Sequence, residues 1–431
     1  MKNENKEKLW SRSFFILWQG QLVSTIGDAV YSIALGFWVL AVTGSTALMG
    51  TLMAASTLPG ILVSPFAGVL IDKCNKKRLF IFLDMIRGIC IVLLAVAANK
   101  GFIAIWMVFA AGILLSVCGA IFAPGIQAAV PELVPKSKVS NATSVFSVVS
   151  AGSNMIGNVA GGFLYQALGA PMLFLFDGLS FIFSGATMPF VKIPKNTRKE
   201  KIHFVEDMAE GFRFMWHQIG LRMILIIAAL SNFFCFIGIV LIMPLCQTTS
   251  YLGAGRYGII MACYMAGSMA GFMFLSIFSP KPKNKFKIFI VTNIISNISM
   301  ISSINQPFFV IMNILLVLAG FTNSIFNVIL ISTVQASTPQ QVRGKVMSFL
   351  NMTTQGFTPF AMALGGVLGG IFPIKTVISA AFIIVFLVTM PSYFIKSFKS
   401  YITAEYQGVS STDAEQNQET EEKETLAEQG I

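Results

Sequence analysis

Two aspartates lie inside long apolar runs of the sequence. Asp28 is near the middle of the first run, about 14 residues and ~20 Å along a helix from its start. Asp177 is about a turn and a half into the sixth run, so we expect it nearer the outer face. A carboxyl group in hydrocarbon is costly to ionise and by default marks a functional site, such as a proton relay. The alternative is a structural acid that bonds to a neighbouring helix.

Asp84 and Arg87 form a second candidate group in the third apolar run. Their spacing of three places both side chains on one face of a helix, where they can pair with each other. We interpret this pair as structural, close to the inner face of a membrane and tied to the preceding loop that contains Asp72.

The acids are unevenly distributed along the chain. No Asp or Glu occurs between Gly211 and Ala404. Any carboxylate-based proton coupling must therefore reside in the N-terminal half, where Asp28 is the first candidate and Asp177 the second.

Amides inside the apolar runs are the candidates for contact with a transported molecule. Intramembrane amides often join helices to one another, so only a subset of them is expected to line a cavity. With 39 Phe and 22 Met, the chain could also build an adaptable apolar cavity wall. The candidate amides are Gln21, Asn154, Asn158, Asn232, Asn323, Asn327, Asn351 and Gln355.

Other chemistries have no support in the sequence. No GxxxxGK[ST] loop is present, which argues against an ATP-driven pump. The two histidines, His203 and His217, lie in a basic linker, and the six cysteines stand singly without metal-ligand spacing. We expect no metal, no cofactor and no enzyme activity.

The elements that must position these residues are membrane-spanning helices. The chain is 55% hydrophobic and 11% charged, where a typical soluble chain has roughly 25% charged residues. Many of its apolar runs reach the ~20 residues that a transmembrane helix needs. Turn and charge breaks predict twelve spans, and hence an all-α fold, near residues 14–42, 46–71, 79–98, 102–130, 140–168, 171–191, 221–247, 254–278, 286–304, 307–334, 345–371 and 375–395.

The basic residues predict the orientation of these spans. If both termini are cytoplasmic, the inside segments contain 26 of the 30 Lys and Arg, and the outside segments only Lys100, Arg256 and Lys375; Arg87 lies within a span. This asymmetry follows the positive-inside rule. The net charge of +11 is thus explained by topology, and we expect no nucleic-acid partner.

Two segments outside the spans complete the predicted organisation. Residues 192–220 form a linker in which Phe204, Met208, Phe212 and Met215 recur at helical spacing, so we expect an amphipathic helix on the inner membrane face. After about Ala404 come eight acids in 28 residues, which predicts disorder. The predicted domains are a cytoplasmic N-terminus (1–13), an N-terminal six-helix bundle (14–191), the linker (192–220), a C-terminal six-helix bundle (221–395) and a disordered acidic cytoplasmic tail (396–431).

The two predicted bundles resemble each other in sequence. A shift of 208 residues aligns Gly50 with Gly258, and a shift of 204 aligns Gly161-Gly162 with Gly365-Gly366 among several other matches. Such a parallel repeat predicts a pseudo-two-fold axis along the membrane normal. In transporters built this way the substrate binds between the halves, and access alternates as they rock.

The loop after the second span carries a recognisable motif. It reads Gly68-Val-Leu-Ile-Asp72-Lys73-Cys-Asn75-Lys76-Lys77-Arg78. An ordinary basic loop explains the lysines but not Asp72, which lies four residues after Gly68 on the same helix face. The motif resembles the signature loop of the major facilitator superfamily, G-x-x-x-D-[RK]-x-G-[RK]-[RK]. Asn75 replaces the second glycine, and we interpret this departure as mild because Asn tolerates a left-handed turn.

The resemblance implies a role for this loop. In the superfamily it is a conformational latch: its acid meets a helix terminus of the other half, where a carboxylate is favoured, and its bases tie neighbouring helices together. The residues that would form the latch here, together with the pair on the third span, are Gly68, Asp72, Lys73, Lys76, Lys77, Arg78, Asp84 and Arg87.

Three further stretches are similar to the macrolide-efflux-like branch, often called the third drug:proton antiporter family. They begin at Trp18, Leu58 and Pro339 and touch both halves. The resemblance implies export of hydrophobic or amphipathic compounds, and it leaves the substrate open.

Two departures from related exporters bear on proton coupling. Many proton-coupled drug exporters carry an arginine in the fourth span, and residues 102–130 contain none. The antiporter motif G-P-x-x-G-G appears as Gly157-Asn158-Val-Ala-Gly161-Gly162, and close helix packing alone could account for its glycines. Antiport therefore stays a hypothesis.

The sequence as a whole predicts a monomeric multi-pass protein of the cell membrane that exports macrolide-like amphipathic molecules by proton antiport. One alternative is a related exporter of a lipid or a siderophore. Apart from Arg87 the spans offer no basic residue away from their ends for an anionic cargo, which argues against it. Another is a membrane sensor without transport, against which the simple acidic tail argues.

Overall fold

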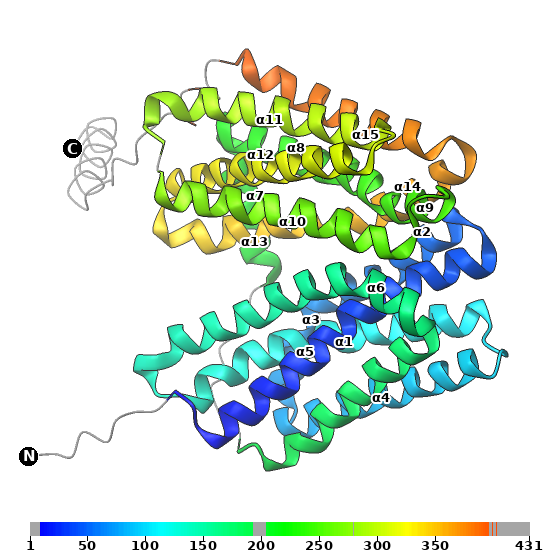
Figure 1. The fold of residues 1–431 in the computed structure, drawn as a ribbon. Helices are drawn as coiled ribbons and strands as arrows, with labels where there is room; N and C mark the ends of the chain where they lie inside the picture. The colour runs from blue at the N-terminus through cyan, green and yellow to red at the C-terminus, as the bar shows by residue number, and fades with distance from the viewer. Residues whose placement is uncertain (1–8, 193–203, 279, 396–398, 400–401, 403–431) are drawn as a thin grey trace, which may run out of the picture.

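The computed structural model describes residues 9–192, 204–278, 280–395, 399 and 402, and the regular structure of this part of the chain is entirely helical. The acidic tail after residue 402, the N-terminal residues 1–8 and the linker residues 193–203 lie outside the described residues. The helices form two bundles, which Figure 1 shows one above the other.

The N-terminal bundle contains six spans. Its helices are α1 (Arg12–Thr43), α2 (Thr46–Ala55), α3 (Leu58–Lys73), α4 (Lys76–Asn99), α5 (Ile105–Leu133) and α6 (Val139–Thr187), with short 3-10 turns η1 (Lys136–Lys138) and η2 (Met188–Phe190). Helices α2 and α3 together make one span. Helix α6 makes two, because Gly169 adopts φ 73° and ψ 168° inside it and Pro171 follows. Glycine adopts a positive φ at little cost because it has no Cβ.

The C-terminal bundle follows the same plan. Its helices are α7 (Phe204–His217), α8 (Ile219–Val240), α9 (Ile242–Thr248), α10 (Gly253–Ile277), α11 (Pro282–Asn305), α12 (Phe309–Ala336), α13 (Gln340–Gly356), α14 (Thr358–Ile371) and α15 (Ile374–Thr389), with the turn η3 (Met390–Tyr393). The pairs α8–α9 and α13–α14 each make one span. Each second helix starts near a proline, Pro244 or Pro359.

The structure is an all-α membrane protein of twelve spans, as the sequence predicts. Ten described segments are long and apolar enough to cross a membrane. One of them, residues 139–190, contains two crossings because of the break at Gly169. The pair α13–α14 supplies the remaining span, in which α13 is polar and contains Gln, Asn, Thr, Arg and Lys.

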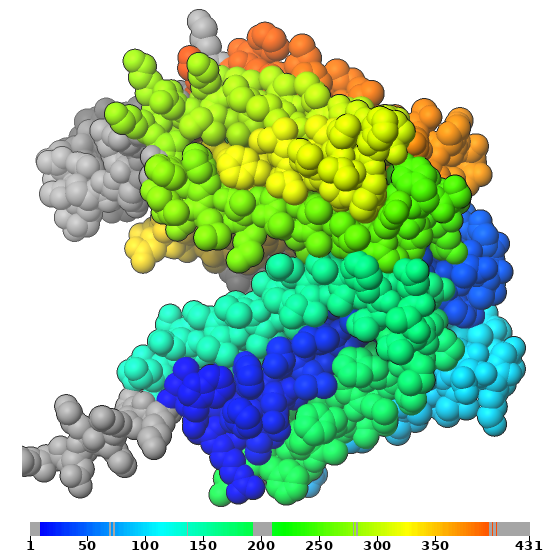
Figure 2. Space-filling model, in the orientation of Figure 1, coloured from blue at the N-terminus to red at the C-terminus, as the bar shows by residue number. Residues whose placement is uncertain are grey.

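A deep cleft separates the two bundles on one side of the molecule (Figure 2). The cleft opens where α1 and α6 begin, and the bundles meet at the opposite end, around α2, α9 and α14 (Figure 1). The start of α1 carries the N-terminus, so the open side is the one to which the positive-inside rule assigns the cytoplasm.

Four glycines, which we call the seam glycines, hold the closed end together: Gly50, Gly162, Gly258 and Gly366. Gly50 on α2 meets Gly366 on α14, where an added Cβ on Gly366 would lie 2.8 Å from the Gly50 Cα. Gly162 on α6 meets α10, where its added Cβ would lie 2.2 Å from the Ala254 carbonyl oxygen. Small residues allow this close approach of two backbones.

The seam glycines also show the internal symmetry. The sequence repeat aligns Gly50 with Gly258 and Gly162 with Gly366. In the structure, Gly50 contacts Gly366, and an added Cβ on Gly258 would lie 2.4 Å from the Val159 carbonyl oxygen on α6. The α2–α14 and α6–α10 crossings are therefore two copies of one contact, related by the pseudo-two-fold axis.

Helix α7 covers the amphipathic stretch of the linker and packs on protein. Met215 is fully buried, Phe212 contacts Phe349 on α13 with ring centroids 5.4 Å apart, and Lys345 Nζ lies 2.6 Å from Glu210 Oε2. Phe212 and Trp216 remain partly exposed, and the expected position of this helix on the inner membrane face stays a prediction. Gly211 lets the backbone of Lys345 on α13 approach closely.

Filling the seam should shift the protein away from the open-cleft state. Gly162→Leu should lower transport at least about ten-fold and should speed labelling of a T46C cysteine, beside Gly366, by a membrane-impermeant maleimide in a background without the native cysteines. Gly152→Leu on the same helix is the control, because an added Cβ there meets nothing within 4 Å. Equal labelling in the two variants would contradict the assigned role of the seam.

Candidate functional site

A buried group of charged residues lies at the meeting of α4, α5 and α6. Asp84 and Arg87 are 0% and 4% exposed, and Arg87 Nη2 donates to Asp84 Oδ1. Ser184 Oγ on α6 donates to Asp84 Oδ2 at 2.8 Å. The guanidinium also lies between two rings, 4.5 Å from the centroid of Phe122 and 4.2 Å from that of Phe181. Such cation–π contacts stabilise a cation that has left water.

Asp177 on α6 is completely buried beside α1. A Cβ added to Gly27 would lie 2.6 Å from Asp177 Oδ1, so the carboxyl group packs against the α1 backbone next to Asp28. Ser180, one turn further along α6, lies beside it, and its Oγ donates to the Asp177 backbone carbonyl oxygen at 2.7 Å. Asp28 and Arg87 both lie within electrostatic range of the Asp177 carboxyl group.

The carboxyl groups of Asp28, Asp84 and Asp177 and the Arg87 guanidinium thus form one cluster, which we call the acid cluster. If every member were ionised, the cluster would hold three negative charges against one positive charge. Like charges repel one another more strongly in a medium of low dielectric constant than in water, so this arrangement favours states in which the charges are partly neutralised.

Tyr31 is a member of this region that sequence reasoning missed. Its ring packs on Phe174 with centroids 5.2 Å apart, and it is 5% exposed. The hydroxyl is buried without a partner among the described residues, within electrostatic range of Asp177 and Asp28. Tyr31 follows Asp28 by three residues on the same helix, and this spacing could have identified it as a neighbour of Asp28.

The structure bears on two expectations about these residues. Asp84 pairs with Arg87 as predicted and also accepts a hydrogen bond from Ser184 on α6; a tie to Asp72 stays a prediction, since the Asp72 side chain lies outside the described part of the chain. Asp177 is not set apart near the outer face, because it lies beside Asp28. Both contacts arise from the second span of α6, which presents positions 177, 180 and 184 on one face toward α1 and α4.

The loop between α3 and α4 ties neighbouring helices together. Lys76 Nζ lies 2.6 Å from Glu132 Oε1 on α5, and Lys77 Nζ donates to the Pro189 carbonyl oxygen of η2. The side chains of Asp72 and Lys73 lie outside the described part of the chain. Gly68 is a half-buried residue of α3, and Arg78 lies exposed in the first turn of α4.

Asn75 has a different role from the one its tolerance of left-handed turns suggested. Its φ is −72° and its ψ 106°, which is extended backbone. Its Oδ1 accepts a hydrogen bond from the Arg78 backbone nitrogen at 3.2 Å, so Asn75 is the N-cap of α4. Asn is among the preferred capping residues.

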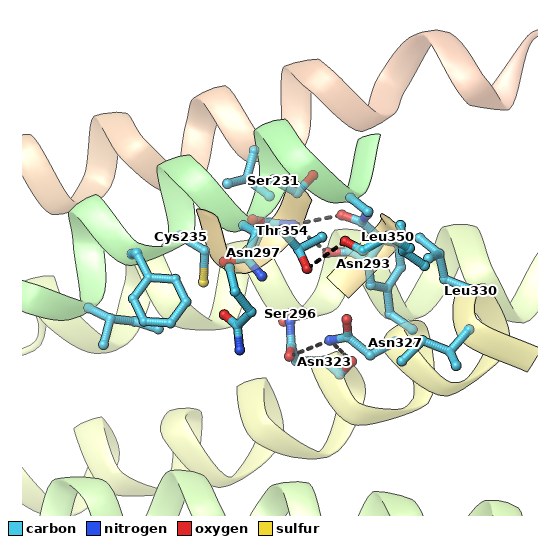
Figure 3. Close-up of a pocket in the computed structure, with 18 of the residues that line it drawn as sticks. Ser231, Cys235, Asn293, Ser296, Asn297, Asn323, Asn327, Leu330, Leu350 and Thr354 are labelled. Carbon is cyan, nitrogen blue, oxygen red and sulfur yellow. Dashed lines mark hydrogen bonds between the residues drawn. The ribbon is translucent and has the colours of Figure 1, made fainter. Parts of the chain in front are cut away.

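A polar cavity of about 380 Å³, which we call the amide pocket, lies within the C-terminal bundle (Figure 3). Helices α8, α10, α11, α12, α13 and α15 contribute to its wall. Five of the predicted amides line it: Asn232, Asn323, Asn327, Asn351 and Gln355.

The amide pocket also contains polar residues that the sequence did not single out. Asn293, Ser296 and Asn297 come from α11 and point into the pocket with the other labelled residues of Figure 3. These residues are three and four positions apart, and this spacing, which places them on one face of a helix, could have identified them. The others are Ser231, Tyr264 and Thr354.

A second cavity, which we call the methionine cavity, lies between the bundles at the closed end of the cleft. It measures about 390 Å³ and is formed by both halves, with Asn158 and Met53 on one side and Met243, Met261 and Met362 on the other. Asn158 is the predicted amide that reaches it. Gln21 and Asn154 line neither the amide pocket nor the methionine cavity.

A third cavity of about 720 Å³ lies between α3 and α5 of one half and α13 and α14 of the other. Asn351 and Gln355 line both this cavity and the amide pocket. Tyr264 and Phe236 in turn line both the amide pocket and the methionine cavity. The amide pocket of the C-terminal bundle therefore adjoins both cavities that lie between the two halves.

The family follows from comparison with known proteins. Residues 17–361 match the sequence model of the Major Facilitator Superfamily. The chain belongs to the major facilitator superfamily. Solved members show the same fold: nucleoside transporter NupG matches with a TM-score of 0.67 at 15% identity, covering 90% of this chain and 100% of that one. A bacterial homologue of the iron transporter ferroportin, in an inward-facing state, matches with a TM-score of 0.65 at 16% identity, covering 89% of this chain and 99% of that one.

Superfamily members with similar sequences include exporters. Macrolide efflux protein A of Streptococcus pyogenes is 23% identical over 371 residues, which cover 84% of this chain and 90% of that protein. Multidrug resistance protein MdtG of Escherichia coli O1:K1 / APEC is 26% identical over 208 residues, covering 46% of this chain and 49% of that protein. The resemblance to the macrolide-efflux-like branch is thereby confirmed.

Removing the guanidinium from the acid cluster should destabilise the protein. Arg87→Met leaves Asp84 buried without its partner, at an expected cost of about 3–5 kcal/mol, and should lower the melting temperature of the purified protein. The double variant Arg87→Met/Asp84→Asn should recover much of the loss, because the uncompensated acid is gone while Ser184 keeps a partner. Equal melting temperatures for the single and double variants would show that the ion pair is not what stabilises this site.

Proposed function

We propose that this protein is a secondary active exporter of amphipathic small molecules, driven by protons that the acid cluster exchanges. The observation that carries the proposal is the excess of carboxyl groups at Asp28, which is half-buried, and Asp177, which is fully buried, in a membrane protein whose halves enclose a cleft. Macrolide efflux protein A and multidrug resistance protein MdtG, which this chain resembles, support the choice of cargo class and direction.

The side on which the cleft opens fits export. With both termini in the cytoplasm, the open cleft admits cargo from inside the cell, and the seam glycines block escape to the outside. Rocking of the two bundles would open the seam and close the cleft, which is alternating access. Protons taken up from outside and released inside would then return the protein to the state that accepts cargo.

We propose that the proton content of the acid cluster influences the seam. Ionised Asp28 and Asp177 would repel each other across the α1–α6 interface, and protonation relieves this repulsion. The same two helices contact the C-terminal half: Phe37 on α1 lies with its ring centroid 5.3 Å from that of Tyr257, and Gly162 on α6 meets α10. A change between α1 and α6 would therefore reach the closed end directly.

The latch loop has a supporting part in this proposal. Lys76 and Lys77 bind α4 to α5 and η2, so the cytoplasmic ends of the N-terminal bundle move together. We propose that Asp72 adds a contact with the C-terminal half when the cleft closes, as the superfamily motif implies. The protein acts in this scheme as a monomer in the bilayer.

Neutralising Asp28 should uncouple transport from protons. In everted vesicles that maintain a proton gradient, an exported drug should dissipate the gradient, and Asp28→Asn should abolish this response and lower drug resistance at least about ten-fold. Asp177→Asn should act in the same direction. Drug-susceptibility panels with and without expression of the chain select the compound to use.

Glu210→Gln provides the control for this experiment, because Glu210 forms a half-exposed surface ion pair with Lys345 that contributes little. It should leave drug-induced proton movement within about two-fold of the unsubstituted protein. Drug uptake that persists after a protonophore collapses the gradient would refute the coupling.

A further inference from the structure

The amide pocket is rich in hydrogen-bonding groups and free of charge. Its lining residues include six Asn and one Gln, with no Asp, Glu, Lys, Arg or His among them. The sequence extends this observation, since no acid occurs anywhere between Gly211 and Ala404. The Arg87 guanidinium in the other half is already engaged by Asp84.

Part of the amide pocket is held in place by its own hydrogen bonds. Asn327 Nδ2 donates to Asn323 Oδ1 at 2.9 Å, and Tyr264 Oη donates to the same oxygen at 3.3 Å. On α11, Asn297 Nδ2 donates to Asn293 Oδ1 at 2.6 Å. A polar lining with fixed positions presents a defined pattern of donors and acceptors to a ligand.

Other polar groups of the pocket lack partners. Ser231 Oγ and Asn232 Oδ1 on α8 are buried and have no hydrogen-bond partner among the described residues. Leaving such groups unpaired costs free energy, which a ligand with hydroxyl or carbonyl groups would recover. An ionised ligand group would instead lose its hydration and find no countercharge, which is far more costly.

The methionine cavity adjoins the amide pocket and has the opposite character. Phe236, Ile239 and Tyr264 line both spaces. Six methionines surround the methionine cavity, and their flexible thioether side chains adapt to apolar groups of different shape. A molecule that occupies both spaces needs a polar, hydrogen-bonding end and an apolar body.

We propose that the cargo is an uncharged amphipath: its hydroxyl- and carbonyl-bearing head, such as a sugar, enters the amide pocket, and its apolar body lies in the methionine cavity. This inference rests on the proposed export function and narrows its substrate class. It assigns recognition of the head group to the C-terminal half and leaves the proton site in the N-terminal half.

Three fluorescent probes that share one dansyl-alkyl body test the proposal. Their heads are a glucosyl group, a trimethylammonium group and a sulfonate, and their uptake is measured in everted vesicles with a proton gradient. The protein should take up the glucosyl probe at least about ten-fold faster than either charged probe. Asn351 lines the amide pocket and the third cavity. Asn351→Asp should slow uptake of the glucosyl probe and speed uptake of the trimethylammonium probe several-fold.

Asn141→Asp is the matched control. Asn141 is exposed in the first turn of α6, where an acid is tolerated, and it lines neither the amide pocket nor the methionine cavity. It should leave the ranking of the probes unchanged. Identical probe rankings for Asn351→Asp and Asn141→Asp would overturn the proposal.

Preference of the unsubstituted protein for a charged probe would also overturn the inference. The exporter proposal would survive that result if the uptake required the gradient and Asp28. If no probe responds to the gradient and Asp28→Asn changes no drug response, the exporter proposal fails, and the assignment of the cargo falls with it.

Discussion

A single buried guanidinium, that of Arg87, faces the buried carboxyl groups of Asp84 and Asp177 and the half-buried one of Asp28, and the N-terminal bundle is arranged around this imbalance. Taking a charge out of water costs several kcal/mol unless close partners compensate. Arg87 receives such compensation from Asp84, Phe122 and Phe181, which draws α4, α5 and α6 together. Asp28 and Asp177 are left with less positive charge nearby. In the proposed mechanism protons neutralise them, so the packing of this bundle and its proton exchange would depend on the same charges.

The two halves share an architecture and differ in the chemistry of their interiors. Duplication is visible in the seam glycines, whose two contacts repeat the same crossing of helices. The N-terminal half contains the membrane-embedded acids, while the C-terminal half contains a neutral amide pocket. Because α1 and α6 carry Asp28 and Asp177 and also contact the C-terminal half, no long chain of intermediate residues is needed to connect the two proposed functions.

The sequence predicted the helices well because the bilayer imposes their length and the loops concentrate the basic residues. It also identified Asp28, Asp177 and five of the amides as candidates, because polar groups in hydrocarbon stand out. Their grouping was not predictable, since it depends on which helix faces meet. The depth of Asp177, the bond between Asp84 and Ser184, and the convergence of α11 with α12 and α13 on one pocket are all products of packing between distant segments. Asn75 illustrates a local limit, because the same side chain can support a left-handed turn or cap a helix.

The separation of acids from the amide pocket has an electrical consequence. In an exchanger that gives up an uncharged molecule for protons, every cycle carries net positive charge inward. Such a cycle draws on the membrane potential as well as on the pH difference, at ~2.3 kcal/mol per charge for each 100 mV. The absence of Asp and Glu from residues 211–404 would then allow the cell to power export at an external pH where the chemical gradient of protons has vanished.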